Sequence, residues 1–281
     1  LVGSEMCIRD SSWNYSLKGD LIGVAFERGV NGLGGMPPGF DKSRHGLRKL
    51  RAERLNGLIF ATFSADTLPL AEYLGPEILE RVRRVTAKPL RLLGTSRQLL
   101  HNNWKLYVEN VKDSYHASLL HSFFATFKLN RLTMRGGIVV DASGGHHVSW
   151  SMGAQDVEGA TEYNSGQIRS QIDDIALADQ NLVASTDEFG DGVSLQILSV
   201  FPNFVMQQVR NSLAVRQVLP KGPDRTELVW TFYGFDDDDA DMLQRRQRQS
   251  NLVGPAGYIS MEDGCVGGFV QRGMALSLIH I

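Results

Sequence analysis

Residues 103–121, NWKLYVENVKDSYHASLLH, constrain this chain more than any other segment because they combine an amphipathic pattern with many potential metal ligands. No Pro or Gly interrupts the pattern, so it predicts a helix over residues 104–120. On that helix Asp113 and His116 lie one turn apart on the same face, as do Glu109 and Asp113. A carboxylate is therefore expected beside the ring nitrogen of His116 that a metal ion does not use.

His116 and His121 are separated by five positions. Five residues correspond to roughly 500° of helical rotation, which leaves the two side chains about 140° apart on an ideal helix. Both can face one ion only if the helix bulges or ends between them. Two imidazoles suit iron, zinc or copper, and a carboxylate from elsewhere would complete the facial triad of non-haem iron enzymes. The alternative is a pair of solvated or core histidines near a helix end.

The pattern N-W-K-x-x-x-E-N-x-x-D-x-Y-H-x-x-x-x-H in this segment resembles the iron-binding motif of Rieske-type aromatic-ring-hydroxylating dioxygenases, in their large (alpha) subunit. The resemblance implies that His116 and His121 bind a mononuclear Fe(II). It implies that Asp113 carries electrons or bridges to the cluster of a neighbouring subunit. It also implies that Asn110 lies near the iron without ligating it tightly.

Chemistry alone does not select a third ligand among the many aspartates of the chain. The resemblance does, because the family carries a similar Gly-Pro-Ala-Gly segment followed by an acidic pair whose second member binds iron. That member is Asp263 here, and Glu262 occupies the position that does not bind, where the family often has Asp. The alternative for this pair is the start of a loop at a Gly. The small residues that follow, 265–268, have no explanation in the sequence.

Composition excludes several classes of function. The 281 residues are 42% hydrophobic and 21% charged, with a formal net charge of −2, as in ordinary globular proteins. We therefore expect neither a nucleic acid nor a membrane as partner. No apolar run is long enough for a transmembrane helix, and no signal peptide is recognisable. Two cysteines are too few for a disulfide framework, which favours a cytoplasmic protein.

The two ends of the chain read differently from the rest. Residues 1–11 and 277–281 resemble translated adapter sequence, so we expect the genuine chain to be a fragment, open at both ends. Residues 12–64 resemble the C-terminal part of a Rieske [2Fe–2S] domain, in which Trp13 and Tyr15 match the aromatic positions and Ser11 stands in place of the last His. A Rieske cluster needs two Cys and two His. Neither C-x-H nor C-x-x-H occurs in the chain, so the cluster is expected only in the full-length parent.

Residues 65–276 are expected to form the catalytic domain. Helical patterns cover residues 68–85, and a strand is expected over 90–101. A hairpin is predicted around Ser143-Gly144-Gly145, and four further strands within 195–233 indicate an antiparallel meander. Alternation over 213–218 predicts one buried face. An acidic start and a basic finish predict a helix after residues 236–239.

Together these patterns predict an α+β fold, in which a truncated Rieske β domain (12–64) precedes a helix-grip catalytic domain (65–276) with an antiparallel sheet. The function implied is dioxygenation of an aromatic substrate with O2, closest to the branch acting on carboxylates such as anthranilate, salicylate or terephthalate. NAD(P)H-derived electrons would come from a reductase or ferredoxin. A homotrimer, or an α3β3 assembly with a small beta subunit, is expected, and the fragment alone is expected to be inactive.

Two other functions are compatible with parts of the pattern. A non-enzymatic helix-grip module would bind a hydrophobic or aromatic ligand and use its histidines only for packing. A zinc hydrolase would use three ligands and an activated water. The Rieske-like residues argue against the hydrolase.

Overall fold

The computed structural model describes residues 12–127, 129, 134–153 and 175–276. The chain divides into two compact units, Leu1–Leu68 and Pro69–Ile281. The polar, weakly periodic residues 154–191 suggest a loop or helix over the site, and residues 154–174 of that segment lie outside the described residues. Both units combine short helices with antiparallel strands, which confirms the α+β class.

The first unit consists of two small antiparallel ribbons. Strands β1 (Asn14–Tyr15) and β2 (Leu21–Gly23) pair around a Lys-Gly-Asp turn. A short 3-10 helix, η1 (Lys42–His45), precedes β3 (Arg51–Leu55) and β4 (Leu58–Thr62). The apolar run over residues 55–63 predicts a single strand, which is wrong, because Asn56 and Gly57 have φ of 46° and 89° and make a tight hairpin turn. Asn-Gly is the preferred pair for such a turn.

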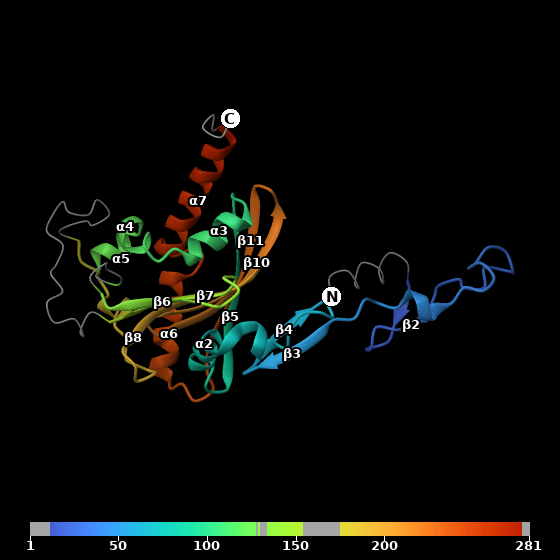
Figure 1. Cartoon of the computed structure of the whole chain (residues 1–281), viewed down its shortest axis with the longest axis horizontal. Helices are drawn as coiled ribbons and strands as arrows, with labels where there is room; N and C mark the ends of the chain where they lie inside the picture. Colours follow the sequence, from blue (N-terminus) through green and yellow to red (C-terminus); the bar gives the residue numbers. More distant parts are fainter. Residues whose placement is uncertain (1–11, 128, 130–133, 154–174, 277–281) are drawn as a thin grey trace. The chain divides into compact units, whose positions relative to one another are not determined.

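The second unit is built on a seven-stranded antiparallel sheet, β5-β11-β10-β9-β8-β7-β6 (Figure 1). Its strands are β5 (Leu90–Leu100), β6 (Gly136–Val140), β7 (His147–Met152), β8 (Val193–Val200), β9 (Phe204–Val209), β10 (Ser212–Gly222) and β11 (Arg225–Phe235). Strands β6 to β11 each pair with the next in sequence, which confirms the predicted hairpin and meander. Strand β5 pairs with β11 at the opposite edge.

Helices lie on both faces of this sheet, and Ala214, Arg216 and Val218 form the buried face that the alternation over 213–218 predicts. On one face Gln196 donates to the carbonyl of Arg81 in α2 (Leu70–Arg84) at 3.2 Å. On the other face Arg216 donates to the Tyr107 hydroxyl of α3 (Trp104–Lys112) at 2.6 Å. On the opposite face of β10 Leu213 is also buried, whereas Gln217 is exposed.

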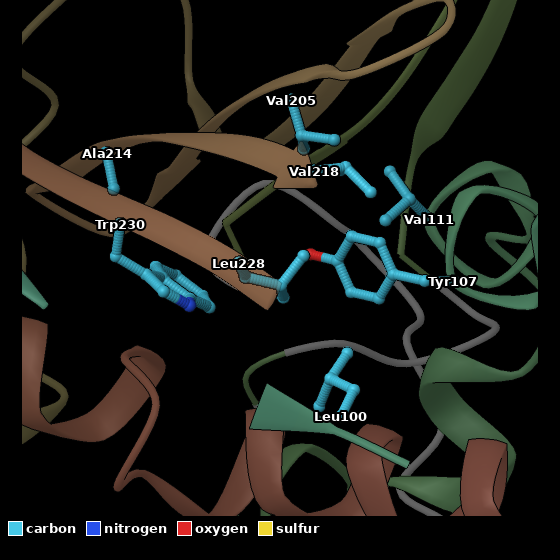
Figure 2. Packing of buried hydrophobic residues seen from close by; sticks show 8 residues of the cluster. All are labelled: Leu100, Tyr107, Val111, Val205, Ala214, Val218, Leu228 and Trp230. Carbon is cyan, nitrogen blue, oxygen red and sulfur yellow. The ribbon is translucent and has the colours of Figure 1, made fainter. Parts of the chain in front are cut away.

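The core beneath α3 fixes the position of that helix. Tyr107 and Val111 of α3 pack against Leu228, Trp230 and other buried side chains of β9, β10 and β11 (Figure 2). The cluster in full is Leu100, Tyr107, Val111, Val205, Ala214, Val218, Leu228 and Trp230. Because the apolar residues of α3 point to this cluster, Asn110 and Asp113 are carried on the neighbouring side of the helix.

The last helix, α7 (Tyr258–Leu276), lies close against the start of α3. A Cβ atom added at Gly267 would collide with the side-chain nitrogen of buried Asn102. The backbone N–H of Asn103 donates to Gln271 at 2.8 Å. These contacts explain the glycine at position 267, because a side chain there would collide with the segment that leads into α3. Within the described residues, no helix has the length and apolar character needed to cross a membrane.

Candidate metal centre

The segment that carries both histidines is not the single predicted helix over 104–120. Helix α3 ends at Lys112, and two short helices follow, α4 (Ala117–Leu120) and α5 (Ser122–Thr126). Asp113 ends α3 in an extended conformation and accepts the backbone N–H of Tyr115 at 2.8 Å. Asp side chains favour such local bonds over helix continuation. His121 is also extended, with φ −79° and ψ 96°.

These two breaks bring both imidazole rings to one place. The ring centroids of His116 and His121 lie 5.2 Å apart. Asp263, from α7, completes the group: its Oδ1 lies 3.5 Å from His116 Nε2 and 3.3 Å from His121 Nε2. One potential ligand atom from each of the three residues lies within 4.8 Å of the others. The helix break that the five-residue spacing required is therefore present.

Asn110 lies between two of these groups. Its Nδ2 donates to Asp263 Oδ1 at 3.1 Å and lies 3.3 Å from His116 Nε2. The amide nitrogen has no lone pair for a metal, so in this orientation Asn110 holds the carboxylate rather than ligating an ion.

Asp113 approaches the opposite edge of the His116 ring. Its Oδ2 lies 3.4 Å from His116 Nδ1, and its side chain is 50% exposed. Glu109, which the helical pattern placed on the same face as Asp113, is exposed on the outer side of α3. Asp113 is thus the carboxylate beside His116, although a turn rather than a regular helix puts it there.

Glu262 is the residue of this centre that the sequence did not assign. Its Oε2 accepts from His121 Nδ1 at 2.8 Å, and its Oε1 accepts from the backbone N–H of Ser122 at 3.1 Å. Glu262 and Asp263 lie inside α7, so the alternative of a loop start at a Gly is wrong. A second acid directly before the expected ligand was the only sequence signal for this contact.

The charges of this group are strongly coupled. Burial acts to lower the pKa of His121, but its hydrogen bonds with Asp263 and Glu262 outweigh burial and raise the pKa to about 9. Burial acts to raise the pKa of Asp263, but the bonds with His116 and His121 hold it well below its usual range. The carboxylate is therefore ionised at neutral pH, as a metal ligand must be.

A cavity of about 580 Å³ opens beside the three residues. Its apolar wall includes Phe124, Leu195, Ile197 and Val209. Phe124 is 4% exposed, packs in the core, and meets the His121 ring edge-on at 5.2 Å between centroids. The aromatic segment after His121 thus serves the core and lines the cavity as well. A volume of this size accommodates a small aromatic molecule.

Arg216 lines the same cavity and is also missing from the sequence prediction. It is 6% exposed and its guanidinium stacks on Trp230 at 4.8 Å. Its Nε is buried without a hydrogen-bond partner. Among the residues described, no carboxylate forms an ion pair with it. A buried cation without a counter-ion is unusual and costly.

His146, which precedes β7, and His147, the first residue of β7, lie outside this group. His146 contacts the carbonyl of Tyr73 at 3.0 Å and accepts the backbone N–H of Phe201 at 3.2 Å. His147 is buried on β7, and burial lowers its pKa. Neither belongs to the cluster of potential ligand atoms around Asp263.

The donor set fits a mononuclear iron ion. Two imidazoles and one carboxylate on one side of an ion are the facial triad of non-haem Fe(II) enzymes, which leaves positions open for other ligands. His121 uses Nδ1 for Glu262, so Nε2 is the nitrogen directed at Asp263.

Comparison with known families agrees with this geometry. Residues 77–279 match the model of the family described as ring hydroxylating alpha subunit (catalytic domain). Because the match covers most of the chain, the protein belongs to this family. The seven-stranded sheet and the cluster of two histidines and one aspartate lie within the matched residues.

Two curated relatives are similar over almost the whole chain. The terminal oxygenase component subunit alpha 2 of terephthalate 1,2-dioxygenase from Comamonas sp is 57% identical over 94% of this chain and 64% of the relative. The large subunit of anthranilate 1,2-dioxygenase from Burkholderia cepacia is 44% identical over 93% of this chain and 62% of the relative. The chain therefore spans somewhat under two thirds of the length of these relatives.

Solved structures give the same fold at lower sequence identity. The naphthalene 1,2-dioxygenase from Rhodococcus sp. bound to indole superposes with a TM-score of 0.70 at 21% identity, over 93% of this chain and 62% of that one.

Proposed function

We propose that this chain is the catalytic part of a ring-hydroxylating oxygenase in which His116, His121 and Asp263 bind one Fe(II). The convergence of these three side chains on one point, within a family of ring-hydroxylating subunits, carries the proposal. Bound Fe(II) would supply O2 activation. In the overall reaction an aromatic ring, O2, two electrons and two protons give a cis-dihydrodiol.

The residues around the three ligands have separate tasks in this proposal. Asn110 holds the Asp263 carboxylate by its hydrogen bond, and burial of His121 keeps water from its ring. The apolar wall with Phe124 and Ile197 excludes water and orients a flat ring beside the metal. Positioning of this kind is a large part of catalysis when two reactants must meet in one geometry.

We further propose that the substrate is an aromatic carboxylate. Relatives at 57% and 44% identity are named for terephthalate and anthranilate, which both carry carboxylates. The cavity supplies a matching group, because Arg216 is buried, lacks a carboxylate partner within the described chain, and has an unpaired Nε. Guanidinium groups bind carboxylates through paired, charge-assisted hydrogen bonds.

The electrons would come from outside the described residues. A Rieske cluster in the full-length parent, reduced by a reductase or ferredoxin, is the proposed donor. Asp113 supports a route for these electrons to the iron site, since it is half exposed and touches the ring of His116. In a homotrimer or α3β3 assembly a neighbouring subunit's cluster would approach this exposed side. The chain alone is then expected to bind iron and substrate but not to turn over with NAD(P)H.

The test is anaerobic equilibrium dialysis of the chain against Fe(II), followed by metal analysis. We expect one iron per wild-type chain, and a loss of binding of roughly 100-fold or more in Asp263→Ala. Asp241→Ala, which removes an exposed carboxylate at the start of α6 (Ala240–Val253), is the matched control and is expected to bind normally. Equal iron in Asp263→Ala and wild type would contradict the site. A wild-type chain that binds benzoate but never iron would favour the non-enzymatic binding module.

A further inference from the structure

Glu262 makes contacts that no role in iron ligation explains. It directly precedes Asp263 on α7, yet its carboxylate points to His121 and Ser122 instead of joining the three ligand atoms. Oε2 accepts from His121 Nδ1 at 2.8 Å. Oε1 accepts from both the backbone N–H and the hydroxyl of Ser122, at 3.1 Å and 2.5 Å. The side chain is thus clamped at both oxygens.

The clamp determines which nitrogen of His121 carries a proton. An ionised carboxylate only accepts hydrogen bonds, so Nδ1 must be the donor in this contact. A metal-binding imidazole must be neutral, and with the proton on Nδ1 its lone pair is on Nε2, the nitrogen that lies 3.3 Å from Asp263 Oδ1. Because Ser122 occupies the other oxygen, Glu262 cannot turn away without losing its remaining partners.

The two histidines differ in how they are held. His116 Nδ1 is buried and makes no hydrogen bond, although Asp113 Oδ2 lies 3.4 Å away. His121 has a short, direct bond to a carboxylate whose side chain is only 21% exposed. One ring is therefore firmly oriented and the other is held loosely. Partners of this kind on a metal-ligating His typically change metal affinity about 10- to 100-fold.

We propose that Glu262 is a positioning residue, which fixes the orientation and the Nδ1–H tautomer of His121 so that Nε2 faces the metal. The inference rests on the proposed iron site and adds a function for the first acid of the pair. The length of Glu is part of it, because Asp at this position is one methylene shorter and would lose either His121 or Ser122.

The substitution Glu262→Gln separates this role from simple packing. The glutamine side chain has the same shape as glutamate, but one of its two ends is an NH2 donor. If its oxygen keeps the two Ser122 donors, its nitrogen faces His121 Nδ1 and favours the tautomer with the proton on Nε2. That tautomer cannot bind a metal through Nε2. Glu262→Gln should therefore lower iron affinity while leaving the fold intact.

The experiment compares anaerobic Fe(II) dialysis and thermal unfolding of the metal-free chain for wild type, Glu262→Gln, Glu262→Asp and Ser122→Ala. Glu109→Gln, the same change at an exposed position of α3, is the control. We expect an affinity about 10- to 100-fold weaker in Glu262→Gln. A smaller loss is expected in Glu262→Asp and Ser122→Ala, and none in the control. Affinity of Glu262→Gln within about twofold of wild type overturns the inference and leaves the iron site standing. No iron in the wild type overturns the proposed function itself.

A second measurement needs no variant and decides the matter if Glu262→Gln does not fold. Nitrogen-15 NMR of the Zn(II)-loaded wild-type chain reports which ring nitrogen of each His carries a proton. We expect His121 with a protonated Nδ1 and a metal-bound Nε2. A metal-bound or unprotonated Nδ1 at His121 would overturn the positioning role.

Discussion

Arg216 and Arg246 are both buried in the second unit, yet their surroundings are opposite. Arg246, on α6, is paired with Asp238 and Glu188 and also donates to the carbonyl of Asn211 at 2.6 Å. Arg216, on β10, contacts the Tyr107 hydroxyl and the Trp230 ring, and the part of the chain that is described offers it no carboxylate.

The difference shows how to separate a structural charge from a binding charge. A buried cation whose donors are all used contributes to the fold and has nothing left for a ligand. A buried cation with a free donor at a cavity wall reduces stability until an anion arrives. Burial alone would have ranked the two arginines together, and only the identity of their partners distinguishes them.

The largest expected effect is on the stability of the chain, through the ion pair of Arg246. Asp238 accepts two hydrogen bonds from Arg246, at 2.7 and 2.9 Å, and one from the backbone N–H of Phe235. Asp238→Asn removes a negative charge that balances the buried guanidinium of Arg246. This loss should lower the free energy of unfolding by about 3 kcal/mol. Urea denaturation measures this change. Benzoate affinity should stay unchanged, and a loss of stability below about 1 kcal/mol would remove the basis of the comparison.

Substitution of Arg216 should have the opposite pattern of effects, with a large change in ligand affinity and a small change in stability. Arg216→Gln should weaken benzoate binding about 10- to 100-fold, since bonds to a charged group contribute about 1.5–3 kcal/mol. Its free energy of unfolding should change by less than about 1 kcal/mol, because an unpaired buried charge is removed. Calorimetry of the Fe(II)-loaded chain measures its affinity for benzoate and for neutral benzamide.

Two controls sharpen this second prediction. Arg225→Gln changes an exposed arginine on β11 and should leave benzoate affinity as in wild type. Benzamide affinity should be the same for wild type and Arg216→Gln. If benzoate and benzamide lose affinity equally, Arg216 shapes the cavity without recognising charge.

Helix α7 packs against the start of α3 and also carries Asp263. A change in its packing should therefore affect both the stability of the chain and its affinity for iron. Gly267→Ala places a Cβ against Asn102 Nδ2, which should destabilise the chain by about 1–2 kcal/mol. Iron affinity should also fall, since Asp263 lies one turn away on α7. Gly273→Ala is the matched control, because a Cβ there meets nothing within 4 Å. Undiminished iron affinity in Gly267→Ala would separate helix packing from the site.

The smallest effect concerns acid stability. Burial acts to raise the pKa of Asp238, but its bonds with Arg246 and its charge attraction hold the pKa below the usual 3.8. A lowered folded-state pKa gives stability that is complete above the unfolded value and is lost as pH falls through the folded value. The thermal unfolding temperature between about pH 5 and pH 2 should therefore fall less steeply in Asp238→Asn than in wild type. Parallel curves would assign acid sensitivity to other carboxylates.

The sequence predicted the sheet well because each strand has its own local signal. Alternation and turn residues separate β8 to β11, and each turn joins neighbours in a meander, so local pattern and topology coincide. The hairpin at Asn56-Gly57 carried an equally local signal, but the surrounding apolar run hid it. The break of the 104–120 helix was harder, since it depends on Asp113 bonding to its own backbone rather than on Pro or Gly.

The residues of the site also divide into those that the sequence identified and those that it did not. His116, His121 and Asp263 were named through a family motif, and the fold then brought them together from segments that are distant in the sequence. Glu262 and Arg216 were not assigned, because their functions depend on partners across the fold. Glu262 meets His121 from another helix, and Arg216 is distinguished by partners that it lacks. The spacing of residues in the sequence indicates neither the presence nor the absence of such a partner.

X-ray absorption spectroscopy of the Fe(II)-loaded chain tests the central claim most directly. We expect two imidazole nitrogens and one carboxylate oxygen from the protein around a single iron, with one imidazole lost in His121→Ala. Iron without imidazole ligands in the wild type, or an unchanged spectrum in His121→Ala, would contradict the assignment of His116, His121 and Asp263 as its ligands.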